Sequence, residues 1–295
     1  MIVSCGEALV DMVPHPVLGG GPMNVAIAAA RLGAPAAFVG GVSTDEYGQR
    51  IMDHLTANGV AVDAVQSSDR PTARAIVEYT PDLVFRFEGE DTADTMLGPV
   101  NLTGLPVPPT IVHGGTLGMF RGKTAESLAT LAAEHRGIVS VDPNVRPQII
   151  DDRASWDHYH ERWLAVAHIY KASDQDLAWI WPGDSEEACV ERLLQRGVNV
   201  VVITRGSDGL VVFGPSLSAT APAPSIEVVD TVGAGDTAIA AVLVGLLDRG
   251  VTDAAGLERL TEPEWKTIAE GATEAAAITC SRAGANPPDR SEVSW

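Results

Sequence analysis

The sequence Asp230-Thr231-Val232-Gly233-Ala234-Gly235-Asp236 runs directly into an apolar segment at residues 238–247. The first half of this stretch is typical of a loop and the second half of a buried helix, so the glycines are predicted at a helix N-terminus. Unpaired backbone N–H groups and the positive end of the helix dipole converge on an anion at such a place. Because glycine and alanine carry little or no side chain, a phosphate can approach this backbone closely.

Asp236 is a carboxylate at the position where phosphate oxygens are expected. It makes chemical sense there if it accepts a proton from an attacking hydroxyl, and an anion cradle with a base beside it predicts phosphoryl transfer to an alcohol. The alternative is that Asp236 only complements the helix dipole, as acidic residues of a first turn commonly do. A loose dinucleotide-binding fingerprint (Gly233, Gly235 and Ala238) is rejected, because neither a βαβ continuation nor an acidic strand end about 20 residues later follows it.

The composition argues against several classes of function. A formal net charge of −19 over 295 residues disfavours nucleic acid or an anionic membrane as partner, since both attract lysine and arginine. Cys5, Cys189 and Cys280 are far apart and match no zinc or redox spacing, which indicates a reducing compartment. No apolar run reaches the ~18 residues of a membrane span, and Met1–Glu7 lacks the basic residues that begin a signal peptide. We therefore expect a cytoplasmic protein.

A second glycine loop lies near the start of the chain. Residues 1–13 are predicted as a first buried strand with Asp11 toward its far end, and Gly19-Gly20-Gly21 follow. An alanine-rich helix is predicted after these glycines, with Asn24 as its N-cap and Gly33 as its stop. Three consecutive glycines exceed the needs of a turn, so we expect a ligand to approach this loop closely.

The rest of the chain alternates strands and helices. Polar residues and glycines follow successive predicted strands, and an open parallel sheet gathers such residues at its carboxyl edge, where ligands bind. The strands are predicted at residues 111–115, 138–141, 168–171 and 200–204, and the polar stretches at residues 142–146, 173–176 and 205–209. Further elements are a strand at residues 39–42 and helices at residues 45–58, 123–135 and 264–280.

Two other segments require interpretation. Residues 72–87 alternate like a hairpin with one wet face, and such an antiparallel insertion in an α/β chain is a candidate lid over a site. The segment Gly118–Thr124 is similar to a P-loop but one residue short. Because a phosphate cradle has a fixed geometry, this segment is predicted as a helix start instead.

The glycine loop at residues 19–26 and the later motif at residues 230–236 together resemble the ribokinase-like family of carbohydrate kinases. The resemblance extends over nearly the whole chain. The segments that look most like the fructokinase branch of that family are residues 6–11, 93–94 and 279–285.

This resemblance implies a fold and a domain organisation. It implies one domain over residues 1–295, with a three-layer α/β/α fold, a mostly parallel central sheet and a small β lid. The lid would comprise residues 72–98 with part of residues 11–18, and it would be the surface of a homodimer.

The resemblance also implies an activity and roles for individual residues. The activity is ATP-dependent phosphorylation of a sugar hydroxymethyl group, with Asp236 as catalytic base and the amides of Gly233, Ala234 and Gly235 as anion hole. Sugar hydroxyls would be held by Asp11, Gly19, Gly20 and Asn24. The nucleotide would be held by Lys171, Thr204, Gly206, Ser207, Gly209 and Gly235. Mg²⁺ would be bound through water by Asp176, and K⁺ would be bound near Asp230, Arg282 and Gly284.

Fructose is the expected sugar, and four alternatives stay open. 2-Keto-3-deoxygluconate would require an arginine for its carboxylate, which Arg86 or Arg146 could supply. A ribokinase is a second alternative, although Gly21 stands where ribokinases carry a lysine. A nucleoside kinase would use the aromatic rings of Phe85 and Phe87.

The fourth alternative belongs to another class, a sugar-binding regulatory protein that has lost catalysis. Such a protein is expected to carry a damaged Gly-Ala-Gly-Asp motif. Residues 233–236 are intact, which favours the enzyme.

Overall fold

The computed structural model describes residues 1–13, 15–79 and 83–294, without the side chains of residues 13, 77–79 and 83–86. Among these residues, a large sheet of eight strands has the order β14-β13-β12-β11-β10-β9-β1-β4. Its strands are β1 (Ile2–Cys5), β4 (Ala36–Val39), β9 (Ile111–Gly115), β10 (Ile138–Asp142), β11 (Ile169–Ser173), β12 (Val200–Thr204), β13 (Leu210–Gly214) and β14 (Leu217–Ala221). All neighbours from β12 to β4 pair in parallel, and β13 and β14 continue the sheet antiparallel. The predicted mostly parallel sheet is confirmed.

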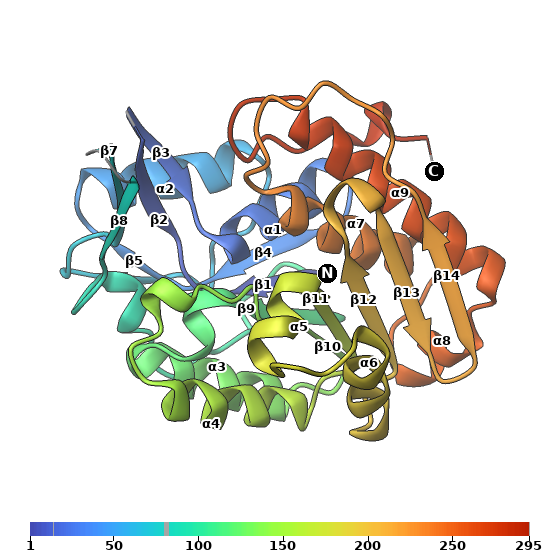
Figure 1. The fold of residues 1–295 in the computed structure, drawn as a ribbon. Coiled ribbons are helices and arrows are strands. Elements are labelled where there is room, and N and C mark those ends of the chain that lie inside the picture. The colour runs from blue at the N-terminus through green and yellow to red at the C-terminus, as the bar shows by residue number, and fades with distance from the viewer. Residues whose placement is uncertain (14, 80–82, 295) are drawn as a thin grey trace.

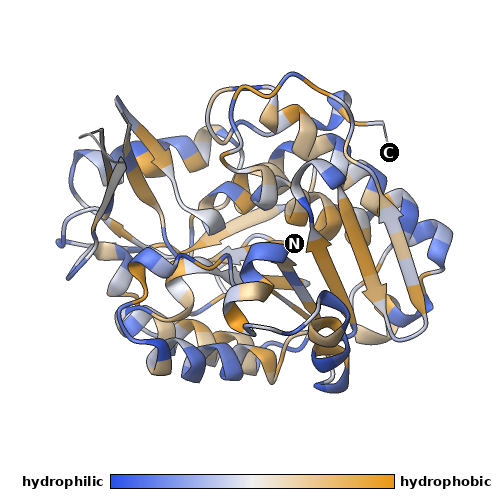
Figure 2. Cartoon of the chain, in the orientation of Figure 1, coloured by the Kyte–Doolittle hydropathy of each residue, from blue (hydrophilic) through white to orange (hydrophobic). Residues whose placement is uncertain are grey.

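Helices cover both faces of the large sheet, which confirms the three-layer arrangement (Figure 1). One face is covered by α1 (Gly21–Arg31), α7 (Ala234–Asp248), α8 (Ala254–Arg259) and α9 (Glu262–Cys280). The other face is covered by α3 (Gly122–Glu134), α4 (Arg153–Leu164), α5 (Asp174–Ile180) and α6 (Glu186–Gln195). The strands are mainly apolar on both faces, as a parallel sheet between helices requires. Figure 2 shows β12 and β13 in orange, whereas the edge strand β14 is paler.

A small sheet of four strands stands at one end of the molecule, at the left in Figure 1. Its strands, in spatial order, are β3 (His15–Gly19), β2 (Leu9–Val13), β7 (Arg74–Tyr79) and β8 (Leu83–Glu88). β7 and β8 pair antiparallel, as expected for residues 72–87, whereas the tip of this hairpin at residues 80–82 lies outside the described residues. Beside it, β5 (Gly41–Ser43) and β6 (Gln66–Ser68) form a parallel pair, and α2 (Glu46–Ala57) packs against α1.

The prediction of one continuous strand over residues 1–13 is wrong. β1 belongs to the large sheet and β2 to the small sheet, because the chain turns between them at Gly6, which adopts φ +151°. A Cβ atom on Gly6 would lie 2.4 Å from Cγ of Pro22, so the turn packs directly against the start of α1. The strand predicted at residues 39–42 is divided in the same way, with Val39 in β4 and Val42 in β5.

The predicted helices occur close to their expected positions, with one correction. α2 has Asp45 as its N-cap, and α3 begins at Gly122, inside the segment that is similar to a P-loop. Asn24 is not an N-cap, because α1 already begins at Gly21 and its N-cap is Gly20. Pro22 explains the earlier start, since proline fits the first turn of a helix without losing a hydrogen bond. None of the helices in the described ranges is long and apolar enough to span a bilayer.

Candidate functional site

The first turn of α7 presents backbone donors to a ligand. Gly233, its N-cap, adopts φ +77°, a left-handed conformation that favours glycine. The N–H groups of Gly233, Gly235 and Asp236 donate to no acceptor within the described part of the chain, whereas the N–H of Ala234 reaches the Thr231 carbonyl at 3.3 Å. Free donors at the N-terminus of a helix are the usual arrangement for holding an anion.

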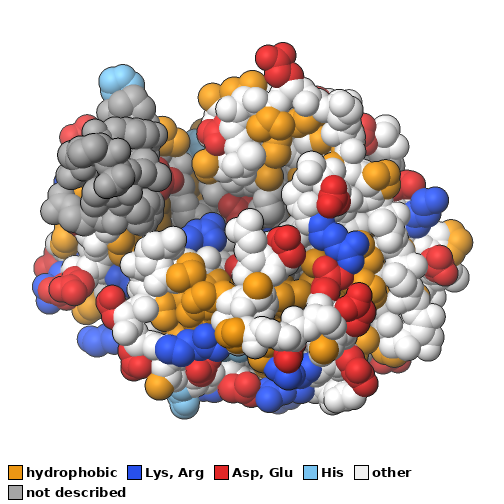
Figure 3. Space-filling view, viewed as in Figure 1, with side chains coloured by type: hydrophobic (Ala, Val, Ile, Leu, Met, Phe, Trp, Pro, Cys, Tyr) orange, Lys and Arg blue, Asp and Glu red, His pale blue; other side chains and the backbone are white. Residues whose placement is uncertain are grey.

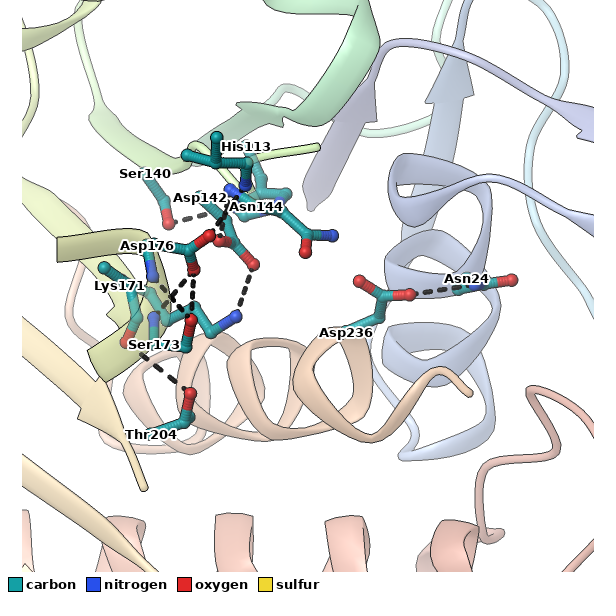
Figure 4. A network of polar contacts seen from close by, with 12 residues as sticks. Asn24, His113, Ser140, Asp142, Asn144, Lys171, Ser173, Asp176, Thr204 and Asp236 are labelled. Atoms are coloured by element: carbon teal, nitrogen blue, oxygen red, sulfur yellow. Dashed lines mark hydrogen bonds and ion pairs between the residues drawn. The ribbon is translucent and has the colours of Figure 1, made fainter. Parts of the chain in front are cut away.

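Asp236 lies among these donors, but its side chain does not cap the helix. Its Oδ2 accepts a hydrogen bond of 2.8 Å from Nδ2 of Asn24, on α1, so the bond joins residues 212 positions apart in the chain. Figure 4 shows the two side chains extending toward each other from α7 and α1. The structure thus brings together two residues that the sequence placed in separate glycine motifs.

Burial changes the acidity of Asp236, which is 7% exposed. Desolvation raises the pKa of this carboxyl above its ordinary value of 3.8, because burial disfavours the charged form. The hydrogen bond from Asn24 and the charges of Lys171 and Arg146 lower the pKa, but they do not outweigh burial. A carboxylate with a raised pKa is a stronger base, which suits proton removal.

Three further residues form a wall beside Asp236. A Cβ atom on Gly21 would lie 2.7 Å from Cγ2 of Thr116, 3.4 Å from Oδ1 of Asp236 and 3.5 Å from Nδ2 of Asn144. Thr116 and Asn144 both have positive φ angles, of 50° and 38°, although neither is glycine. Backbone strain of this kind gathers at functional sites, where surrounding contacts hold it in place. No side chain at position 21 could be accommodated without displacing this wall.

A buried ion pair lies behind the first turn of α7. Nζ of Lys171 donates to Oδ2 of Asp142 at 2.7 Å, and both side chains are almost fully buried. Nζ of Lys171 is also 3.0 Å from the position that a Cβ atom on Gly235 would take. Burial alone would lower the pKa of Lys171, but the charges of Asp142 and Asp176 outweigh it and raise the pKa. A permanent positive charge therefore lies directly beneath the free amides.

Asp176 is held by the protein on both carboxylate oxygens. Oδ1 accepts from the backbone N–H of Val145 at 2.7 Å, and Oδ2 accepts from the backbone and hydroxyl of Ser173 at 2.8 and 2.7 Å. These bonds place Asp176 in the capping box of α5, a structural role that explains its burial. In the described ranges, no three His, Cys, Asp or Glu side chains are grouped as a metal site.

The residues predicted to hold the sugar surround the crossing from the small sheet to α1. Asp11, on β2, pairs with Val17 on β3, and its Oδ2 would lie 2.6 Å from a Cβ atom on Gly19, which is also in β3. Burial raises the pKa of Asp11, while the charge of Arg146 lowers it. Arg86 is part of β8, but its side chain lies outside the described residues. In the space-filling view the molecule is hollowed between the small sheet and the body (Figure 3).

Arg146 is close to both ends of the predicted sugar site, because its charge acts on Asp11 and on Asp236. Its Nη1 donates to the backbone oxygens of Asn144 and Val145 at 3.2 and 3.0 Å. Among the described residues it has no ion pair with a carboxylate. The guanidinium is therefore available to an anionic ligand.

The residues predicted for the nucleotide follow β12 at the carboxyl edge of the large sheet. Thr204 ends β12 opposite Ser173, and its hydroxyl donates to the Ala172 oxygen at 3.5 Å (Figure 4). Gly206 and Ser207 continue into a 3₁₀ turn at Gly206–Asp208. A Cβ atom on Gly209, which has φ +95°, would lie 2.1 Å from the Ala221 oxygen, so the fold itself requires this glycine.

The segments predicted for K⁺ also meet. Oδ2 of Asp230 accepts from the N–H of Gly284 at 2.9 Å, and Oδ1 accepts from the N–H of Val232 at 3.0 Å. The guanidinium of Arg282 is directed elsewhere, to Glu292 and the Pro287 oxygen. A guanidinium has no acceptor atom, so any role of residue 282 toward a cation would fall to its backbone oxygen.

Sequence reasoning missed several residues of this site. It identifies Asp142 and Asn144 only as polar residues after a strand, and it does not single out Thr116. The partner of Asp142 is 29 positions away on the neighbouring strand, so only the pairing of β10 with β11 brings Lys171 to it. A single sequence carries no sign of the positive φ angles of Thr116 and Asn144.

Comparison with known proteins gives consistent results. The pfkB family carbohydrate kinase model matches residues 14–292. A fructokinase of Rhizobium leguminosarum bv. trifolii is 35% identical over 260 residues, which cover 83% of this chain and 79% of that protein. Among solved structures, a fructokinase from Xylella fastidiosa with bound ATP superposes with a TM-score of 0.88 at 24% identity, over 96% and 93% of the two chains. A Vibrio cholerae O395 fructokinase double mutant with bound fructose, ADP and potassium ion gives 0.82 at 23% identity, over 96% and 93%.

Proposed function

Because the chain belongs to the pfkB family of carbohydrate kinases, we propose that it transfers the γ-phosphate of ATP to a hydroxymethyl group of fructose. Membership of the family makes it an ATP-dependent sugar kinase. The observation that carries the assignment of the site is the position of Asp236, a buried carboxylate beside the free amides of α7 and bonded to Asn24. The choice of fructose rests on the relative that is 35% identical.

In this proposal each group has one task. Asp236 removes the proton from the attacking hydroxyl, and the amides of Gly233, Ala234 and Gly235 stabilise the negative charge on the transferred group. Lys171 adds a positive charge behind them. Asp11, Gly19, Gly20 and Asn24 orient the sugar, while Thr204, Gly206, Ser207 and Gly209 hold the nucleotide at the sheet edge.

We propose that Mg²⁺ is held chiefly by the phosphates of ATP and by water. Mg²⁺ keeps several waters and usually takes one or two protein carboxylates. The donor set fits an indirect role, because a carboxylate offers about four acceptor positions and Oδ1 of Asp176 has a single protein donor. Asp176 would accept a hydrogen bond from a Mg²⁺-bound water, and the ion would neutralise phosphate charge.

The proposal is tested by ADP release with several acceptors. We expect kcat/KM for fructose to exceed that for 2-keto-3-deoxygluconate, ribose and adenosine by about tenfold or more, the size of discrimination that a few pocket contacts provide. The available guanidinium of Arg146 favours 2-keto-3-deoxygluconate as the second candidate. A higher kcat/KM for that acid would replace fructose in the proposal. No sugar-dependent ADP release with any acceptor would favour the regulatory protein instead.

We propose that the small sheet, with residues 72–98 and part of 11–18, is a lid. It is a separate sheet from the one in the body, and it borders the site at Asp11. If it closes only over bound sugar, water is excluded before phosphoryl transfer. The sugar-free arm of the same assay should then show ADP release far below the rate with fructose. Sugar-free hydrolysis at a similar rate would contradict a closing lid.

We also propose that K⁺ activates the enzyme. A hydrogen bond from the N–H of Gly284 to Asp230 joins the two segments predicted for this ion, near the N-terminus of α7. The Asp230 carboxylate and the backbone carbonyls of these segments would supply the oxygen ligands that such a cation requires. Turnover with fructose and ATP should rise several-fold when tetramethylammonium is replaced by K⁺ at constant ionic strength. Equal turnover in the two salts would rule out this role.

A further inference from the structure

Glu7 is a buried carboxylate for which the proposed reaction has no use. It lies between β1 and β2, where the chain crosses from the large sheet to the small sheet, and it is 2% exposed. In the described ranges no cation forms an ion pair with it. Burying an unpaired carboxylate is costly, so its retention calls for a reason.

Its two oxygens bind three donors from two distant segments. Oε1 accepts from the N–H of Gly21 at 3.3 Å and from the hydroxyl of Thr116, and Oε2 accepts from the N–H of Gly118 at 3.0 Å. Gly21 is the first residue of α1, whose own N-cap supplies no side-chain acceptor. Glu7 therefore provides, from another part of the chain, the negative charge that a helix N-terminus favours.

The same two segments form the wall beside Asp236. Cγ2 of Thr116 faces Gly21 so closely that a Cβ there would lie 2.7 Å away. Thr116 has φ +50°, a strained conformation for threonine that requires support. The hydroxyl bond to Glu7 holds this residue while its methyl group faces the site.

The backbone around Glu7 leaves little freedom for adjustment. A Cβ atom on Gly20 would lie 2.6 Å from the backbone oxygen of Glu7. A Cβ atom on Gly118 would lie 2.7 Å from Cα of Gly6. The connection from β1 to β2 at residues 6–8 and the connection from β3 to α1 at residues 19–21 thus pack on each other and on the loop after β9. A change at the Glu7 carboxylate would be transmitted directly to Gly21 and Thr116.

We propose that Glu7 is a positioning residue for the acceptor sugar, which fixes the spacing between Gly21 and Thr116 next to Asp236. This inference rests on the proposed kinase function. Glu7 acts through its two partners and does not touch the reacting atoms. Its loss should therefore weaken use of the sugar and leave the nucleotide, whose proposed contacts lie at the end of β12, nearly unaffected.

The test is Glu7→Gln, which keeps the shape but replaces one acceptor oxygen with a donor facing another donor. The loss of hydrogen bonds to a charged group predicts a rise of about 10- to 100-fold in KM for fructose, with KM for ATP unchanged. Glu126→Gln is the matched control, because Glu126 is an exposed residue of α3 paired with Arg162. It should change neither KM.

Variants of Thr116 test the same hydrogen bond from its other partner, and they stay informative if Glu7→Gln does not fold. Thr116→Val removes the hydroxyl but keeps the methyl group toward Gly21, and should reproduce the rise in KM for fructose; Thr116→Ser keeps the hydroxyl and should have a smaller effect. Because the two side chains act as one unit, Glu7→Gln with Thr116→Val should add little to either single change.

The pH dependence separates positioning from a general loss of stability. Burial raises the pKa of Glu7 to about 7, against the lowering effect of its bonds to Thr116 and Gly118, and the charge of Asp94 raises it further. The titratable groups near it are Asp94, whose charge Arg121 balances, and the thiol of Cys5. Below this pKa Glu7 is protonated and loses acceptor capacity, so the wild-type KM for fructose should rise as pH falls through about 7. In Glu7→Gln this rise should be absent.

Three outcomes would overturn the inference. Glu7→Gln could leave KM for fructose unchanged, it could raise KM for fructose and ATP equally, or it could keep the wild-type pH profile. Measurement of the wild-type enzyme in the same experiment distinguishes failure of this inference from failure of the proposed function. If wild type shows no sugar-dependent turnover, the function and this inference both fall. If wild type turns over and the variant matches it, only the role of Glu7 is refuted.

Discussion

Asp236→Asn should lower kcat by about 10²- to 10⁴-fold, the usual contribution of a general base. Asparagine preserves the size of the side chain and can still bond to Asn24, but it cannot accept the proton of the attacking hydroxyl. The binding of sugar and ATP should change little. ATP is expected to bind slightly more tightly, because a negative charge near the γ-phosphate is removed.

The pH profile gives this prediction a second measurement. Burial raises the pKa of Asp236, so wild-type kcat should fall as acid protonates the base, at a pH above the ordinary aspartate pKa of 3.8. The variant should lack that limb. Asp248→Asn, at the opposite end of α7, is the matched control and should keep full turnover. If Asp236 only complemented the helix dipole, its variant would lose on the order of 1 kcal/mol of stability and keep wild-type kcat.

Part of this site could be predicted because its chemistry is local in the sequence. The free amides of Gly233 and Gly235 and the carboxylate of Asp236 lie within one helical turn, so a single stretch of sequence specifies their geometry. The same holds for the carboxyl edge of the large sheet. Once the parallel strands are placed, the residues that follow them must gather at one edge.

The remainder depends on tertiary contacts. The apolar residues on both sides of Gly6-Glu7 predict one strand over residues 1–13. The packing of Gly6 on Pro22 explains why the chain instead leaves one sheet for another there. Asn24 is a residue type typical of helix caps, which is why the sequence predicts a cap, whereas its amide bonds to Asp236 on a distant helix. The sequence could not show that Glu7 accepts hydrogen bonds from two separate segments, because its donors are 14 to 111 positions away.

Lys171 illustrates a residue whose importance for stability and for function can be separated. Its ammonium is the counter-ion of Asp142 and lies beneath Gly235 in the first turn of α7. Removal of one partner of a buried pair strands the other charge, whereas replacement of both is often well tolerated. The two roles therefore predict different outcomes for single and double variants.

Lys171→Met should lower the free energy of unfolding by about 3–5 kcal/mol, because Asp142 is left buried without its counter-ion. Asp142 already has a pKa raised by burial to about 6, against the lowering effect of Lys171, and without the lysine the pKa should rise further. The wild-type and variant carboxyls differ in protonation only between their two folded pKa values. The deficit in the free energy of unfolding should therefore be largest at high pH, shrink as pH falls from the variant's higher pKa to about 6, and stay constant below that.

Lys171→Met combined with Asp142→Asn should recover most of this stability, because no buried charge is left unpaired and the amide oxygen introduced at position 142 can still accept from the N–H of Asn144. Turnover should nevertheless stay low in the double variant, with a raised KM for ATP, because the positive charge beneath the amides of α7 is still missing. Urea unfolding and ADP release measured on wild type, the single variant and the double variant decide the matter. Recovery of turnover together with stability would show that Lys171 serves only to balance Asp142, and the phosphate would then be held by the helix N-terminus without its help.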